Sequence, residues 1–167
     1  MSDDRRWFAL RVRHQHEQAA AIVLGMKQLE TFSPALRQRR RWSDRTKMLV
    51  VPLFPSYVFC RFEHEKRLSV LNTPGVLSIV GFGTRPAPVS DEEIAAVRTA
   101  IASGKAIEPW PYLKSGERVE VTHGPLKSLK GVLVQSKNDC RVVVSVDLLM
   151  RSVAVEVDRD CLALMPR

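Results

Sequence analysis

The sequence is poor in cysteine and has no long hydrophobic run. Its three cysteines, Cys60, Cys140 and Cys161, are too few and too widely separated to form a disulfide framework, so reduced thiols are expected. No apolar stretch approaches the length needed to span a bilayer, and the first residues lack the apolar core of a signal peptide. These absences predict a cytoplasmic protein with no membrane-bound part.

The sequence also lacks the residue patterns of enzymes and metal sites. It shows no nucleophile–base pair, no paired carboxylates within a motif and no glycine-rich phosphate loop. The segment 14–17, His-Gln-His-Glu, has no cysteine or further histidine at a ligand spacing, so it is interpreted as a polar loop before a helix. We therefore expect no catalysis, no metal and no cofactor.

Positive charge is unevenly distributed along the chain. The 167 residues have a formal net charge of +8. Residues 1–62 contain 12 Lys and Arg against 5 Asp and Glu, whereas residues 63–167 contain 14 against 13. This bias indicates a polyanion or a strongly acidic protein as a partner of the N-terminal part, with solubility alone as the alternative.

The N-terminal part alternates between strand and helix patterns. Residues 7–13 alternate with a period of two, which places Phe8, Leu10 and Val12 on one face of a half-buried strand. Helical spacing over residues 16–29 predicts an apolar face made of Ala19, Ile22, Val23, Met26 and Leu29. A second, short helix is expected over residues 63–72, with Leu68 and Leu71 pointing inward.

Residues 52–62, Pro-Leu-Phe-Pro-Ser-Tyr-Val-Phe-Cys-Arg-Phe, predict a strand with two different faces. One face, with Val58, Cys60 and Phe62, suits a core. The other bears two aromatic residues and an arginine, which are favoured at partner surfaces: Tyr57, Phe59 and Arg61. Burial of the strand on both sides is the alternative, because a short apolar run does not tell which face is covered.

The densest charge run lies at residues 37–47, with five arginines, one lysine and one tryptophan. A basic strand pair or loop tip of this kind can contact phosphates through its arginines and stack a base on Trp42. A solvated hairpin arm is the competing interpretation.

The C-terminal half changes in character after residue 104. Ser90 and Glu93 form a capping box that predicts a helix ending at Gly104. Residues 105–112 contain two prolines and no periodicity, which favours a linker. Four short valine-rich segments follow and predict a small barrel: 117–122, 131–136, 140–146 and 152–157. The expected fold class is α+β, with an antiparallel sheet flanked by helices in residues 1–104, a linker, and a five-stranded β-barrel in residues 113–167.

The order of these motifs resembles a known family. The series Leu-Phe-Pro-Ser-Tyr-Val-Phe, Asn-Thr-Pro-Gly-Val, Val-Gly-Phe-Gly and Pro-Val-Ser-Asp-Glu-Glu is similar to the N-terminal domain of NusG-type transcription factors. The tail, from Gly116 through the turn at residues 123–131 to Val157, resembles the KOW domain that follows it. The resemblance covers about residues 6–165.

This resemblance implies a factor that rides on elongating RNA polymerase. The family's N-terminal domain docks on the clamp helices through an aromatic-apolar surface, which by position would contain Phe54, Tyr57, Phe59 and Trp7. The basic residues would lie beside upstream DNA or the non-template strand, with these candidates for nucleic-acid contact: Arg11, Arg13, Arg37, Arg39, Arg40, Arg41 and Arg45.

For the tail, the resemblance implies a second partner, either termination factor Rho or a small-subunit ribosomal protein. The family commonly has Phe-Gly-Arg before the last strand, where this chain has Leu149, Met150 and Arg151, and an exposed Leu149-Met150 pair is expected to provide the contact. Residues 52–62 look more like specialised, RfaH-like paralogs than like housekeeping NusG. A monomer is expected. A ribosome-associated or free RNA-binding protein that uses the barrel is the alternative function.

Overall fold

The computed structural model describes residues 3–166, and the chain divides into two compact units, Met1–Pro88 and Val89–Arg167. Both units contain antiparallel sheets, which confirms the predicted α+β class. The helix predicted to close the first domain groups instead with the second unit. The division into residues 1–104 and 113–167 stays a prediction.

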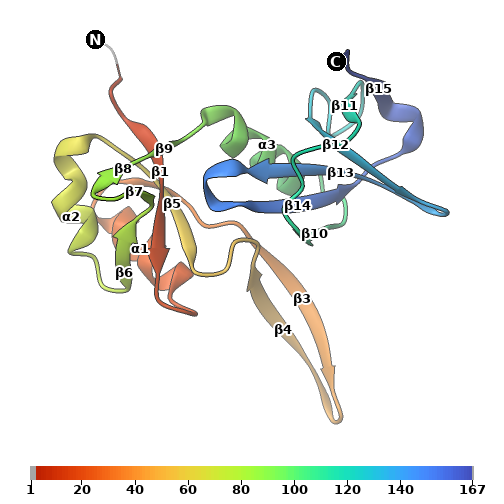
Figure 1. The fold of residues 1–167 in the computed structure, drawn as a ribbon. Coiled ribbons are helices and arrows are strands. Elements are labelled where there is room, and N and C mark those ends of the chain that lie inside the picture. The colour runs from red at the N-terminus through yellow and green to blue at the C-terminus, as the bar shows by residue number, and fades with distance from the viewer. Residues whose placement is uncertain (1–2, 167) are drawn as a thin grey trace. The chain divides into compact units, whose positions relative to one another are not determined.

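The first unit is built on an antiparallel sheet with the strand order β2-β5-β1-β6, and β9 also pairs with β1 (Figure 1). Two further pairs, β3 with β4 and β7 with β8, form separate hairpins. The strands are β1 (Arg6–Val12), β2 (Glu30–Phe32), β3 (Ala35–Trp42), β4 (Arg45–Pro52), β5 (Tyr57–Phe62), β6 (Val76–Ile79), β7 (Gly81–Phe82), β8 (Arg85–Pro86) and β9 (Pro88–Val89). The helices are α1 (Glu17–Met26), the 3-10 turn η1 (His64–Lys66) and α2 (Arg67–Leu71).

The core of this unit lies between the central strands and the two helices. The predicted inward face of β1 pairs with that of β5, and the rings of Phe8 and Phe62 lie 4.6 Å apart. Val58 and Cys60 are fully buried beside them. Side chains from α1 and α2 complete the cluster: Ala20, Ala21, Leu24 and Val70. The strand alternation read from the sequence is therefore confirmed on this face.

The buried face of α1 differs from the predicted one. Ile22 and Met26 are 63% and 77% exposed, whereas Ala20, Ala21 and Leu24 are buried together with Glu17. The buried positions still follow helical spacing, but the face starts at a charged residue and is made mostly of small ones. The prediction is wrong for Ile22 and Met26, because small residues and Leu24 pack against the sheet instead, whereas Leu29 does pack against the core and Val23 is partly buried.

The inward face predicted for the second helix is also wrong. Leu68 is 66% exposed and Leu71 is 37% exposed, and Val70 is the buried residue of α2. A five-residue helix presents barely more than one turn, so a single residue is enough to attach it to the core.

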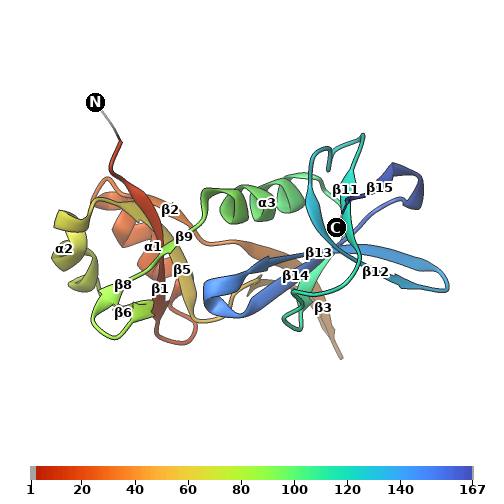
Figure 2. The same cartoon turned by 45° about the horizontal axis from the view of Figure 1, so that its top comes forward.

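The second unit contains a six-stranded antiparallel sheet with the order β10-β14-β13-β12-β11-β15, consistent with a small barrel. Its strands are β10 (Ile107–Trp110), β11 (Arg118–Val121), β12 (Lys130–Ser136), β13 (Asp139–Val146), β14 (Arg151–Glu156) and β15 (Leu162–Leu164). Two 3-10 turns, η2 (Asp147–Leu149) and η3 (Arg159–Cys161), precede β14 and β15. The helix α3 (Asp91–Ala102) runs alongside β13 (Figure 2).

The segment predicted as a linker contains an edge strand. Residues 107–110 pair with β14, so that Pro109 lies on the outermost strand, where a missing N–H is tolerated. Arg141 of β13 forms an ion pair with Glu108 and lies 5.5 Å from the ring of Trp110. Sequence periodicity cannot reveal this strand, because contacts with β13 and β14 stabilise it.

The cap of α3 agrees with the predicted capping box. Ser90 Oγ accepts a hydrogen bond of 3.2 Å from the Glu93 backbone N–H, and the Glu93 carboxylate is hydrogen-bonded to the Ser90 backbone in return. The Glu93 carboxylate also accepts a hydrogen bond from the backbone N–H of Asp147 at 2.8 Å. Among residues 3–166, no helix is long and apolar enough to cross a membrane.

Candidate functional site

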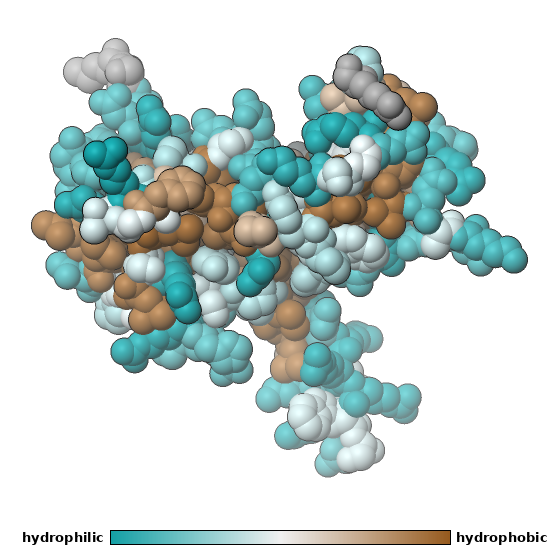
Figure 3. All heavy atoms as spheres, viewed as in Figure 1, coloured by the Kyte–Doolittle hydropathy of each residue, from teal (hydrophilic) through white to brown (hydrophobic). Residues whose placement is uncertain are grey.

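The β3–β4 hairpin is the most strongly charged element of the first unit. Residues 35–52 contain six Lys and Arg and a single acidic residue, Asp44. The two strands pair with each other alone and extend away from the sheet of their unit (Figure 1). Hydrophilic residues cover the outer part of the hairpin, and hydrophobic ones lie nearer its base (Figure 3). The hairpin is therefore a cationic arm with both faces accessible to a ligand.

The strand register divides the charges between two faces of the hairpin, because directly opposite residues point to the same side. Arg37, Arg39 and Arg41 share one face with Val50, Met48 and Thr46. We call this the triple-arginine face. The tryptophan face has Trp42 opposite Arg45 at the tip and Arg40 opposite Lys47 below it. The Trp42 side chain is 57% exposed.

The spacing of the triple-arginine face suits a polyanion. Alternate side chains along a strand are about 6.6 Å apart, which is comparable to the separation of neighbouring phosphates in a nucleic-acid strand. The tryptophan face adds an exposed indole next to cations, a combination that can stack an unpaired base. The arm can thus contact a nucleic-acid backbone on one side and a base on the other.

The other two predicted nucleic-acid residues lie on a different element. Arg11 is the residue before the last one of β1, lies opposite Tyr57 of β5, and is exposed. Arg13 follows β1, where its backbone N–H donates a hydrogen bond of 2.8 Å to the Gly75 carbonyl. These two arginines therefore belong to the end of the central sheet, whereas the other five belong to the hairpin.

The predicted docking aromatics are largely buried. Phe59 is fully buried, Phe54 is 1% exposed and Trp7 is 5% exposed, so the expectation of an open aromatic face is wrong in this structure. Phe59 packs edge-on against Phe54 at 5.4 Å and stacks near Phe32 at 6.0 Å. Only Tyr57, at the end of β5, is partly accessible. The alternative of burial on both sides is therefore correct for Phe59, whereas Tyr57 and Arg61 of the same face are partly accessible.

Arg61 also differs from the expected docking role. Its guanidinium forms ion pairs with Asp3 at 3.1 Å and with Glu30 at 3.5 Å. Asp3 in turn contacts Arg5 at 2.8 Å, and this hydrogen bond is the main reason why the pKa of Asp3 falls to about 2. Arg61 thus takes part in a network within its own unit.

Several exposed apolar side chains on the first unit were not expected. Phe82, on the β7–β8 hairpin, is 76% exposed, and Leu77 of β6 is 52% exposed. Leu68, Ile22 and Met26 are further exposed apolar residues of the same unit. Periodicity could not indicate this exposure for Leu68, Ile22 and Met26, because each occupies a predicted core position of its helix.

In the second unit, the predicted partner-binding triplet has one buried member. Leu149 is 6% exposed at the end of η2, whereas Met150 is 63% exposed and Arg151 is exposed at the start of β14. Met150 adopts the left-handed conformation with φ 50°, which turns the chain sharply between η2 and β14. The expected pair of exposed apolar residues is therefore reduced to Met150.

Asp147 holds the loop before β14 in place through three contacts. Tyr112 donates a hydrogen bond of 2.9 Å to its carboxylate, Lys114 lies 3.9 Å away, and its backbone N–H donates to Glu93. Burial raises the pKa of Glu93, and the negative charge of Asp147 adds to this effect. The loop with Met150 is thus anchored on one side.

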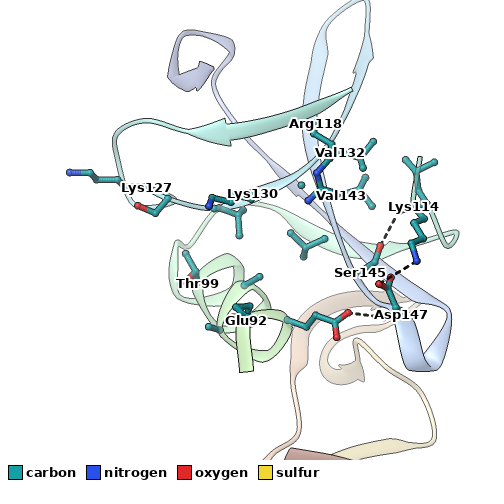
Figure 4. Close-up of a pocket in the computed structure, with 18 residues that line it drawn as sticks. Glu92, Thr99, Lys114, Arg118, Lys127, Lys130, Val132, Val143, Ser145 and Asp147 are labelled. Atoms are coloured by element: carbon teal, nitrogen blue, oxygen red, sulfur yellow. Dashed lines mark hydrogen bonds and ion pairs between the residues drawn. The ribbon is translucent and has the colours of Figure 1, made fainter. Parts of the chain in front are cut away.

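A groove of about 560 Å³ lies next to this loop, between α3 and the sheet of the second unit (Figure 4). Val132 and Val143 form part of its apolar floor, and α3 contributes Glu92 and Thr99. Four cations from the sheet and its turns surround it: Lys114, Arg118, Lys127 and Lys130. Three carboxylates, Glu92, Glu93 and Asp147, also line the groove, so both signs of charge surround its apolar floor. Among the described residues, no group of three or more His, Cys, Asp or Glu could hold a metal ion.

Comparisons with known proteins agree with this architecture. Residues 5–98 match the family described as NusG, transcription termination factor nusG. The chain is 33% identical to a protein named transcription termination/antitermination protein NusG from Deinococcus radiodurans, over 64% of this chain and 65% of the relative. Proteins with the same name from Pseudomonas aeruginosa and Borreliella burgdorferi are 33% and 23% identical, with 62% and 95% of their lengths covered. The matches thus span just under two thirds of the first two relatives.

A solved structure, described as domain interaction in Thermotoga maritima NusG, aligns over 97% of this chain and 98% of its own, with a TM-score of 0.52. At 20% sequence identity, this likeness supports the fold alone.

Proposed function

Because the chain belongs to the NusG family of transcription factors, we propose that it docks on RNA polymerase and modulates pausing, antitermination or termination. The observation that supports this most directly is the basic β3–β4 hairpin on a unit whose sequence matches the family. Such a hairpin suits a protein that works next to the nucleic acids of an elongation complex. The proposed function involves no catalysis and no membrane, and the protein would carry it out in the cytoplasm.

Docking on the polymerase clamp helices would use Tyr57 together with its neighbour Arg11. The two residues lie directly opposite each other on β5 and β1, and both are accessible. A tyrosine beside an arginine combines rigid apolar area with a planar donor, which interfaces favour. In this proposal Phe54, Phe59 and Trp7 support the docking surface from beneath.

The hairpin would contact upstream DNA or the non-template strand. Its triple-arginine face would bind phosphates, and Trp42 would stack on an unpaired base. Arg11 and Arg13 lie on another element and would make separate contacts.

The second unit would recruit a further partner, Rho or a small-subunit ribosomal protein, through Met150 and Arg151. Met150 is the exposed apolar residue of this loop, and Arg151 adds a charge beside it. The other candidate function is RNA binding by the second unit alone, which would use the four cations that line its groove beside three carboxylates.

Two binding measurements on the full chain separate the two functions. One uses purified RNA polymerase elongation complexes, and the other uses a single-stranded RNA. Tyr57→Ala is expected to weaken polymerase binding by about tenfold or more, the cost of truncating an interface tyrosine, and to leave RNA binding unchanged. Leu164→Ala, an exposed apolar residue of the second unit, is the control. RNA binding without any polymerase binding would favour the RNA-binding function and contradict our proposal.

A further inference from the structure

Three polar side chains from distant parts of the sequence meet at one end of the second unit. Thr122 and His123 directly follow β11, and Cys161 directly precedes β15. Val121 pairs with Leu162 in the antiparallel ladder between these strands, which brings the three residues together. The Cys161 Sγ lies 3.3 Å from His123 Nε2, and His123 Nδ1 lies 2.9 Å from Thr122 Oγ1.

The hydrogen bonds around Thr122 favour one tautomer of the His123 imidazole. The Thr122 hydroxyl lies 3.0 Å from the Cys161 carbonyl oxygen, which can accept its proton beside that of the Thr122 backbone N–H. In this arrangement the hydroxyl oxygen accepts from His123, and Nδ1 is the protonated nitrogen. Nε2 then has a free lone pair directed at the Cys161 thiol. A thiol, a base and a group that orients the base are the parts of an activated nucleophile.

Cys161 is also the accessible cysteine among the three. Its side chain is partly exposed, and those of Thr122 and His123 are exposed. Cys60 is fully buried and Cys140 is 8% exposed, and burial raises the pKa of both thiols. A reagent in solution therefore meets a single thiol that has a proton acceptor in contact with it.

We propose that Cys161 is a site of reversible mixed-disulfide formation with low-molecular-weight disulfides, with His123 as the general base and Thr122 as a positioning residue. Nothing in the proposed role on RNA polymerase uses these residues, so the inference is independent of it.

The exchange reaction replaces one sulfur–sulfur bond by another and moves one proton. His123 Nε2 accepts the proton of the Cys161 thiol, and Sγ attacks one sulfur of the disulfide. A new sulfur–sulfur bond forms while the original one breaks. The Cys161 sulfur is oxidised, and the departing sulfur is reduced and leaves as a thiolate, which takes the proton back from the imidazolium. The disulfide reagent is the oxidant.

The test uses the full chain, glutathione disulfide as the probe, and peptide mapping by mass spectrometry to locate the adduct. At neutral pH the adduct is expected on Cys161, and Cys161→Ser is expected to abolish it. His123→Gln should slow formation by about tenfold or more, in the range of a lost general base. Thr122→Val should slow the reaction as well, because the imidazole loses the contact that fixes its tautomer.

Circular dichroism and thermal unfolding of each variant verify that the fold is retained. Because His123 and Thr122 are both exposed, their substitution should leave the melting temperature nearly unchanged. Equal rates in the wild-type protein and in both folded variants would overturn the proposal. Modification of Cys140 or Cys60 at a rate similar to that of Cys161 would overturn it as well.

Discussion

The carboxylate of Glu17 accepts a hydrogen bond of 2.9 Å from the backbone N–H of Ser56. Glu17 is only 4% exposed, in the first turn of α1, and Ser56 has a positive φ of 69° in the turn that leads into β5. The Ser56 carbonyl accepts a hydrogen bond from Val12 N–H at 2.9 Å. One charged side chain therefore fixes the turn before β5, at the end where Tyr57 and Arg11 lie.

Replacement of Glu17 by alanine should lower the free energy of unfolding by about 1–3 kcal/mol, because the Ser56 N–H loses its acceptor in a poorly hydrated place. Urea-induced unfolding followed by circular dichroism measures this change. Glu65→Ala is the control, since Glu65 is exposed and should shift stability by no more than about 0.5 kcal/mol. A similar, small effect of both substitutions would show that the buried carboxylate does not stabilise the turn.

Two glycine-to-alanine substitutions should have opposite effects. A Cβ at Gly131 in β12 would collide with the Val143 carbonyl oxygen and lie 2.7 Å from Val142 Cγ1, so Gly131→Ala should destabilise the second unit by about 1–3 kcal/mol. A Cβ at Gly25 in α1 meets no atom within 4 Å, and Gly25→Ala should stabilise the protein by about 0.5–1 kcal/mol. Thermal unfolding of both variants measures the difference. If Gly131→Ala were as stable as the wild type, β12 and β13 could not approach each other as closely as they do here.

The stability of the protein should fall in alkaline solution because of Cys60. Burial raises the pKa of its thiol to about 12 from an ordinary value of 9.0, so the native state keeps a proton that the unfolded chain loses. The stabilisation is fully present below the unfolded pKa and decreases as the pH rises above it. At about pH 10 the loss is roughly 1.4 kcal/mol.

Urea unfolding near neutral pH and at about pH 10 tests this dependence. Cys60→Ala should show a smaller decrease between the two conditions than the wild type, whereas Cys161→Ala should retain the wild-type decrease. An identical decrease in the wild type and Cys60→Ala would mean that other groups cause it.

The two faces of the β3–β4 hairpin should contribute differently to nucleic-acid binding. Joint substitution of Arg37, Arg39 and Arg41 by glutamine should weaken binding to single-stranded and duplex DNA alike and reduce the salt dependence by about one unit per lost phosphate contact. Trp42→Ala should weaken binding to single strands more than to duplexes, because a duplex offers no free base to stack on.

Fluorescence anisotropy at several salt concentrations measures both effects. Lys137→Gln, at an exposed turn of the second unit, is the charge control and should change neither the affinity nor the slope. An unchanged salt slope in the triple variant would show that these arginines do not contact phosphates.

The sequence by itself determined the features that depend on near neighbours along the chain. The alternation of Phe8, Leu10 and Val12 and of Val58, Cys60 and Phe62 identified two central strands and their core face, because strand side chains alternate strictly. The valine-rich segments of the C-terminal half identified β11 to β14 for the same reason. The basic run at residues 37–47 similarly predicted an exposed arm.

Tertiary structure alone decided everything that depends on contacts between distant segments. The alternation that identified β5 gives no information on what covers its second face, and Phe59 is fully buried against Phe54 and Phe32. The edge strand β10 exists because β14 and Arg141 are there to hold it. No pattern pairs Cys161 with His123, which are 38 residues apart and meet only through the β11–β15 ladder. The periodicity of a sequence describes a single helix or strand, whereas the burial, pairing and reactivity of its side chains depend on the elements packed against it.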